Sequence, residues 1–236
     1  MKKHLFWILC ALVFYTASAV NAQDVRVKCG FAVMNVTSTN VRCLQIDENI
    51  VAADGASREE IAKTQIASTI LRFEDLEYIP SAIRPQVIFY DVNDLGKVSL
   101  SLLDVSMNLS DMLDNIRSGY GSVEDVYTQT PFLPYQVYDP TASWQPALLD
   151  FNNGSGIRRI VVFGDTVFSS ISECNLYYAY QGMTDDGLYY ISAVFPLTSS
   201  SLNGKPAAEA GQSGGSSDYQ PSLDRLDYYI KSIVIE

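Results

Sequence analysis

The chain has 236 residues but only one histidine, and this residue, His4, lies in a segment that we expect to be removed. Two lysines near the start are followed by the apolar stretch Leu5 to Tyr15, and small residues then supply a cleavage site after Ala22. This succession is typical of a secretory signal peptide. The sequence therefore predicts a signal peptide at 1–22 and a secreted or periplasmic mature chain without an imidazole.

The loss of histidine excludes several classes of chemistry. Ser-His-Asp and Cys-His hydrolysis, histidine-containing zinc sites and histidine general-base catalysis all need an imidazole. No lysine lies three residues after a serine, so the Ser-x-x-Lys dyad is missing as well. We therefore expect no catalytic residues, no metal site and no cofactor, and we predict that the protein is not an enzyme.

Basic residues are scarce too. When the two lysines of the signal peptide are taken from the 16 basic residues, 14 remain against 27 acidic ones, a net charge of −13. Such a surface repels phosphate backbones and anionic lipid headgroups. No stretch after Tyr15 reaches the roughly 18 apolar residues that span a bilayer. We expect no nucleic-acid partner and no stable membrane insertion after cleavage.

Three cysteines remain in the mature chain: Cys29, Cys43 and Cys174. In an oxidising compartment the near pair, Cys29 and Cys43, would close a loop of about 15 residues and contribute roughly 3 kcal/mol. The alternative is that all three are small buried side chains. No pair has the Cys-x-x-Cys spacing of a redox or zinc site.

Hydrophobic periodicity predicts a mixture of strands and helices. Strands are predicted at 25–34, 41–46, 69–73, 87–90, 157–163 and 233–235. Helices are predicted near 58–64, at a stretch that includes 109–116 and ends by Gly119, and after Pro221. Gly154 to Gly156 is predicted as part of a turn, and 198–217, rich in serine, glycine and alanine, as a flexible loop.

The sharpest local prediction is a β-hairpin centred on Asp186 and Gly187, between two aromatic runs. Its register places one set of side chains in the core: Leu176, Tyr178, Tyr180, Tyr189, Ile191, Ala193, Phe195 and Leu197. The opposite face is expected to be half wet. Aromatic rings with polar tips can stack on sugars or peptides. The candidate ligand-binding residues are therefore Tyr177, Gln181 and Tyr190, although tyrosine also favours sheet faces without any ligand.

Carboxylates offer one route to catalysis without histidine, because glycoside hydrolysis needs only two of them. The candidates are Asp47 with Glu48, Glu74 with Asp75, Asp104, Asp111 and Asp114. Asp91, Asn93 and Gly96 imitate the start of a calcium-binding EF-hand loop, but leucines stand where two ligands are needed. We interpret that stretch as the end of a strand with a polar turn.

Several segments together resemble a group of uncharacterised exported bacterial proteins. The matching segments are 84–90 (RPQVIFY), 131–134 (PFLP), 149–151 (LDF), 154–158 (GSGIR), 178–187 (YAYQGMTDDG) with 189–190 (YY), 221–227 (PSLDRLD) and 232–234 (SIV). The resemblance implies export and a compact α+β domain, and it brings no known activity. The closing helix and strand also resemble the end of the sandwich domain of the PsbP extrinsic protein of photosystem II, which bears on architecture alone.

These observations predict a single α+β domain over 23–236, with a mostly antiparallel sheet packed by helices and a flexible loop at 198–217. The leading hypothesis for function is a non-catalytic extracytoplasmic binding or accessory protein for a small-molecule, glycan or protein partner. The alternatives are a histidine-free hydrolase that uses paired carboxylates on glycans, and a structural component of an envelope assembly.

Overall fold

The computed structural model describes residues 24–37, 40–49, 66–76, 81, 83–124, 140–163, 170–172, 174–213 and 218–236. The expected signal peptide at 1–22 and the predicted helix near 58–64 lie outside the described residues. Within these ranges, no helix combines the length and the apolar character that crossing a membrane requires.

The described residues form twelve strands and five helical segments. The strands are β1 (Val25–Cys29), β2 (Ala32–Val36), β3 (Val41–Ile46), β4 (Ser68–Phe73), β5 (Gln86–Asp91), β6 (Ala142–Phe151), β7 (Gly154–Val162), β8 (Leu176–Thr184), β9 (Tyr189–Pro196), β10 (Thr198–Ser199), β11 (Tyr219–Gln220) and β12 (Val234–Ile235). The helices are η1 (Glu74–Leu76), α2 (Val92–Val98), α3 (Leu100–Arg117), α5 (Ala207–Ser213) and α6 (Leu223–Lys231).

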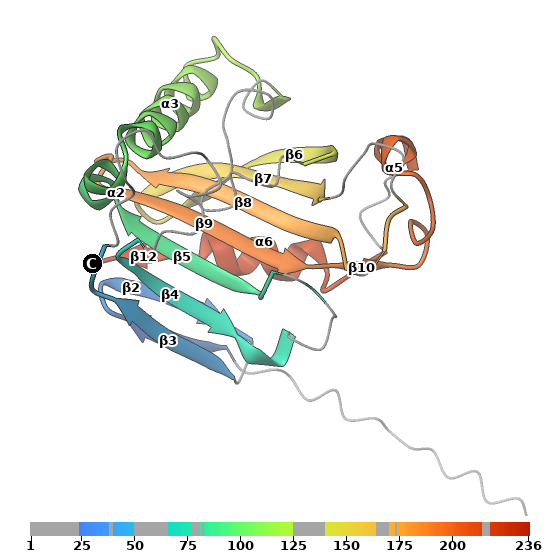
Figure 1. The fold of residues 1–236 in the computed structure, drawn as a ribbon, viewed down its shortest axis with the longest axis horizontal. Coiled ribbons are helices and arrows are strands. Elements are labelled where there is room, and N and C mark those ends of the chain that lie inside the picture. The colour runs from blue at the N-terminus through green and yellow to red at the C-terminus, as the bar shows by residue number, and fades with distance from the viewer. Residues whose placement is uncertain are drawn as a thin grey trace, which may run out of the picture.

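Seven of these strands form one antiparallel sheet in the order β3-β4-β5-β9-β8-β7-β6 (Figure 1). A smaller antiparallel sheet has the order β1-β2-β12, so the last strand of the chain pairs with the first hairpin. The predicted α+β class with a mostly antiparallel sheet is therefore confirmed.

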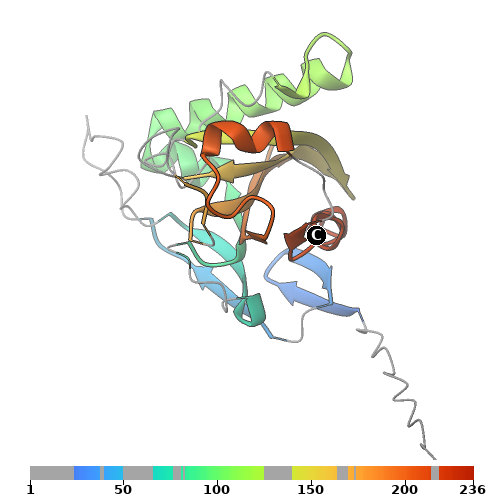
Figure 2. The same cartoon turned by 90° about the vertical axis from the view of Figure 1, so that its right-hand side faces the viewer.

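Both faces of the large sheet are covered (Figure 1, Figure 2). Helices α2 and α3 pack on one face through side chains that include Leu95, Leu102 and Leu109. Helix α6 and the small sheet pack on the other, where Phe73 lies against both Phe195 and Tyr229, with ring centroids 5.1 and 5.4 Å away. The predicted helix around 109–116 is the second half of α3, and Gly119 ends it with a φ of 76°.

The β8–β9 hairpin has the predicted register. Tyr178 pairs with Phe195 and Tyr180 with Ala193, and both pairs lie in the core beneath α6. In the turn, the Asp186 carboxylate accepts hydrogen bonds from the Thr184 hydroxyl at 2.6 Å and from the backbone N–H of Leu188 at 3.0 Å. These bonds lower the pKa of Asp186, so the turn is held by a charged acceptor.

The expectation of a half-wet opposite face is wrong. Tyr177, Gln181 and Tyr190 are at most 2% exposed. Tyr190 lies in the cluster under α2 and α3, and Tyr177 packs beside Phe163, with ring centroids 5.3 Å apart. Period-two alternation shows which residues share a face, but it does not show what covers that face.

Three local predictions also need correction. The opening strand at 25–34 is instead the hairpin β1–β2, because Gly30, with φ at 58°, turns the chain. Gly154 to Gly156 begins β7 and is buried. The segment at 198–217 contains β10 and α5, and Leu202, Ala207 and Ala210 are buried in the main core.

The last helix and strand form as predicted. Ser222 caps α6 by accepting a hydrogen bond from the backbone N–H of Arg225, and the helix buries the apolar residues Leu223, Leu226, Tyr229 and Ile230. Burying one such side chain contributes about 1.5–3 kcal/mol. A helix of this length is marginal in isolation, so its packing on the large sheet is what stabilises it.

A polar network anchors α6 to the sheet from below. Tyr178 donates a hydrogen bond to Asp227 Oδ1 at 2.9 Å, and Arg158 Nε lies 3.4 Å from the same oxygen. Arg158 also donates from Nη1 to the backbone oxygen of Gln145 at 2.7 Å. Gln145 has a φ of 52° at the bulge in β6, so Arg158 stabilises a backbone conformation that few residues adopt.

The neighbouring Tyr180 provides a comparison for this network. Its buried hydroxyl has no hydrogen-bond partner in the described part of the chain. Burial holds the pKa of Tyr178 and of Tyr180 well above the usual value, so both phenols are protonated at neutral pH. The Tyr180 ring lies over the paired glycines Gly156 and Gly182, where a Cβ would come within 2.6 and 2.8 Å of its Cζ atom.

We expect Tyr178→Phe to lower the free energy of unfolding by about 2 kcal/mol, because a buried hydrogen bond to a charged group is lost. Tyr180→Phe removes a hydroxyl with no partner among the described residues and should leave stability unchanged or raise it. Urea denaturation at pH 7 measures both variants against the wild type. Equal losses in the two variants would contradict the assignment of the stabilising bond to Tyr178.

Candidate functional site

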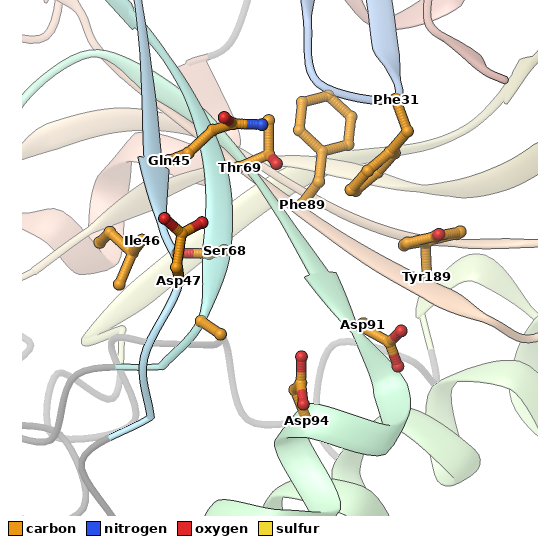
Figure 3. A pocket seen from close by; sticks show the side chains of 11 residues that line it. Phe31, Gln45, Ile46, Asp47, Ser68, Thr69, Phe89, Asp91, Asp94 and Tyr189 are labelled. Atoms are coloured by element: carbon orange, nitrogen blue, oxygen red, sulfur yellow. The ribbon is translucent and has the colours of Figure 1, made fainter.

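A cavity of about 300 Å³ lies where the β1–β2 turn meets strands β3, β4 and β5 and the start of α2 (Figure 3). Its described lining combines three aromatic rings, three carboxylates and a few neutral polar groups. Gln45 and Asp47, at the edge strand β3, are exposed, so the cavity opens to solvent on that side.

Strand pairing brings the lining together. Gln45 on β3 pairs with Thr69 on β4, and Thr69 pairs with Phe89 on β5, so the three side chains form a row on one face. Two residues further along, Asp91 at the end of β5 pairs with Tyr189 on β9. Alternation carries Asp47 to the same face as Gln45.

The aromatic wall comes from three distant parts of the chain. Phe31 follows Gly30 in the β1–β2 turn, and its ring centroid lies 4.4 Å from that of Tyr189 and 6.3 Å from that of Phe89. Burial and the nearby carboxylates Asp91 and Asp186 raise the pKa of Tyr189, so its hydroxyl is protonated and can donate a hydrogen bond.

A disulfide holds the turn that carries Phe31. Cys29 is bonded to Cys43, with the Cα atoms 5.4 Å apart, which is the first of the two alternatives that the sequence leaves open. The bond joins the residue before Gly30 to β3, which carries Gln45 two residues later. A Cβ on Gly30 would lie only 2.7 Å from Gln45 Nε2, so the turn approaches β3 closely. Cys174 is a free and exposed thiol.

The three carboxylates differ in their partners. Asp91 caps α2 by accepting a hydrogen bond from the backbone N–H of Asn93 at 2.8 Å. Asp94, in the first turn of α2, lies 2.7 Å from Lys97 Nζ, and this contact raises the pKa of Lys97. Asp47 forms no hydrogen bond or ion pair with any residue of the described ranges.

The residues proposed from sequence lie elsewhere. Tyr177 donates to the backbone oxygen of Cys174 and accepts from Ser81, both at 2.8 Å, while Tyr190 donates to Gln181 Oε1 at 3.0 Å. None of the three candidates, Tyr177, Gln181 and Tyr190, lines the cavity. Their binding role stays a prediction, and these positions present no surface to solvent.

The candidate carboxylate pairs do not converge either. Among them, Asp47 alone lines the cavity, and its neighbour Glu48 is exposed. Glu74 lies 3.3 Å from Arg42 Nε in an ion pair, and the exposed residues Asp104, Asp111 and Asp114 lie along α3.

Asp91 and Asp94 were missed as site residues, although the sequence contains a signal for them. They stand at the first and fourth positions of the stretch that imitates an EF-hand loop. Asp91 ends a strand, as expected, and the following residues form a helix rather than a turn. Within the described ranges, no group of three acidic, cysteine or histidine side chains lies close enough to hold one metal ion.

No protein-family model matches the chain, and neither a curated protein nor a solved structure matches it. The resemblance to exported bacterial proteins therefore stays a prediction, and the function has to be argued from the cavity itself.

We expect the double change Cys29→Ala with Cys43→Ala to lower the free energy of unfolding by about 3 kcal/mol, because the unfolded chain regains the freedom of a loop with a sequence separation of 14. The matched control is Cys174→Ala, which removes an exposed thiol that bonds no other cysteine. Guanidinium denaturation without reductant measures both. A double variant as stable as the control would show that the disulfide contributes nothing.

Proposed function

We propose that the protein is an exported, non-catalytic binding protein that receives a small ligand in the cavity lined by Phe31, Phe89 and Tyr189. The supporting observation is the convergence of aromatic rings with carboxylates and hydroxyls on one cavity of about 300 Å³. Ligand sites of proteins are concave, have volumes from about 300 Å³, and combine apolar walls with a few polar groups that orient the ligand.

The partners of the carboxylates favour binding over hydrolysis. A glycosidase needs one carboxyl group as the acid and a second as the base or nucleophile, both directed at the same bond. Asp91 is the cap of α2, and Asp94 is paired with Lys97. Two of the three carboxylates at the cavity thus have structural roles, which leaves Asp47 without a catalytic partner among the described residues.

Export to the periplasm or the cell exterior is part of this proposal. Its supports are the signal-peptide pattern at 1–22 and the Cys29–Cys43 disulfide, a bond that persists mainly in oxidising compartments. The resemblance to exported bacterial proteins agrees with it. A PsbP-like sandwich remains our proposal for the finer architecture, supported by the closing helix and strand at 223–235.

Filling the cavity tests the proposal without assuming a ligand. Ala67, which lines the cavity, is changed to Trp, and Ala208, exposed on α5, is changed to Trp as the control. A panel of amines, neutral sugars, carboxylates and short peptides is tested by thermal shift and by ligand-observed NMR. We expect at least one compound to bind the wild type and the Ala208 variant, and to lose its binding in the Ala67 variant.

The result depends on the cavity variant being folded, which near-ultraviolet circular dichroism verifies. Compounds that bind all three proteins equally would place the binding site elsewhere. A panel without any binder would contradict the proposed function.

A further inference from the structure

We infer that the ligand of this cavity is an organic cation, an ammonium compound whose charge lies between Asp47 and the rings of Phe31 and Tyr189. The inference rests on the proposed function and specifies the class of ligand. It follows from the charge, the aromatic wall and the hydroxyl-bearing side chain of Thr69, which are independent features of the same cavity.

The first feature is charge. Asp47, Asp91 and Asp94 line the cavity, and none of the described lining residues is basic. Lys97 offsets Asp94 through their ion pair, so the remaining negative charge comes from Asp47 and Asp91. Figure 3 shows the Asp91 and Asp94 side chains on one side of the cavity and Asp47 extending from the β3 side. The cavity therefore attracts a positively charged group.

The second feature is the aromatic wall formed by Phe31, Phe89 and Tyr189, which lies beside Asp91 and across the cavity from Asp47. The rings of Phe31 and Tyr189 are tilted by 31° to each other, whereas Phe89 meets Phe31 edge to face at 83°. The faces of aromatic rings carry partial negative charge and bind ammonium groups, above all where water is displaced. Rings on one side, with Asp91 beside them and Asp47 across from them, form a site for a cation that is also apolar in part.

The third feature is the hydroxyl of Thr69. This residue is 5% exposed, and its side chain lines the cavity between Gln45 and Phe89. The hydroxyl forms no hydrogen bond with a described residue, and it is not one of the fully buried atoms that lack a partner. A ligand with a hydroxyl or carbonyl group near its ammonium group can form a hydrogen bond with it.

The same geometry argues against a metal ion. Three carboxylates face the cavity, but no three acidic side chains of the described residues are close enough to coordinate one ion. Calcium would need six to eight oxygen ligands at about 2.3–2.6 Å. A dispersed set of charges around an aromatic wall fits a larger cation with its charge spread over several atoms.

Paired probes that differ in charge alone test the inference. Choline is compared with its neutral isostere 3,3-dimethylbutan-1-ol, and 1,4-diaminobutane with 1,4-butanediol, by isothermal titration of the purified protein. We expect at least one cation to bind at least fivefold more tightly than its neutral partner. Asp47→Asn should weaken this binding by about fivefold, the effect of a partly exposed ion pair.

The matched controls separate charge from shape. Asp104→Asn removes one exposed negative charge on α3 and should leave the affinity unchanged. Phe31→Leu keeps an apolar side chain but removes the ring face. It should lower the affinity for the cation and leave the affinity for the neutral isostere unchanged. Asp47 is exposed and unpaired among the described residues, so its change to Asn does not endanger the fold.

Several outcomes would overturn the inference. If neither cation exceeds its neutral partner, or if Asp47→Asn has no effect, the ligand is not recognised by charge. Calcium binding that requires Asp47 and displaces choline would replace the organic cation with a metal ion. If neutral probes bind the wild type but not the Ala67→Trp variant, the proposed function stands and only the charge of the ligand is wrong. If Ala67→Trp abolishes the binding of no probe, both the proposed function and this inference are wrong.

Discussion

The structure depends on the register of the β8–β9 hairpin. The turn at Asp186 and Gly187 sets the pairing of β8 with β9. This pairing decides which aromatic side chains of the two strands face α6 and which lie on the opposite face of the sheet, where α2 and α3 pack. A slip of one residue would exchange the two faces completely. Because β9 also pairs with β5, the same register places Tyr189 beside Asp91. The core and the cavity are therefore consequences of one turn.

The ends of the described chain are joined near the cavity by two further constraints. Strand β12 pairs with β2, so the small sheet is complete only when the last residues lie beside the first hairpin. The Cys29–Cys43 disulfide ties β1 to the edge strand of the large sheet. Because Phe31 lies in the turn between β1 and β2, its position against Tyr189 depends on contacts between residues far apart in sequence.

Sequence patterns correctly predict those features that depend on residues close together in the chain. The β8–β9 register, the Cys29–Cys43 disulfide, the capped helix α6 and the end of α3 at Gly119 all follow from residues close in sequence. The candidate site, by contrast, cannot be predicted from residues that are close in sequence. Gln45, Thr69 and Phe89 form a row only once the order β3-β4-β5 is known, and no single strand contains that information.

The wrong predictions about the hairpin face and about Gly156 also arise from contacts between residues that are far apart in sequence. The polar residues on one side of the hairpin predict a wetter face for Tyr177 and Tyr190, yet other elements bury both. The glycine preference for turns predicts a turn at Gly156, but here a glycine is needed beneath the Tyr180 ring. In both cases tertiary contacts outweighed a preference that is correct on average.

The polarity of the large sheet changes along one face, and this change explains why a cavity forms at its edge. The first row is apolar: Leu71, Val87 and Ala193 lie in the core, and the row ends at the exposed Cys43 on the edge strand. The next row adds polar groups: Gln45, Thr69, Phe89 and Ile191. The last row contains Asp91 paired with Tyr189, with Asp47 at the edge. Burying the Asp47 carboxylate, which has no partner among the described residues, would cost several kcal/mol, and this cost disfavours an apolar element over the last row. The hairpin that carries Phe31 covers the second row, and the space beyond it remains open to solvent and charged.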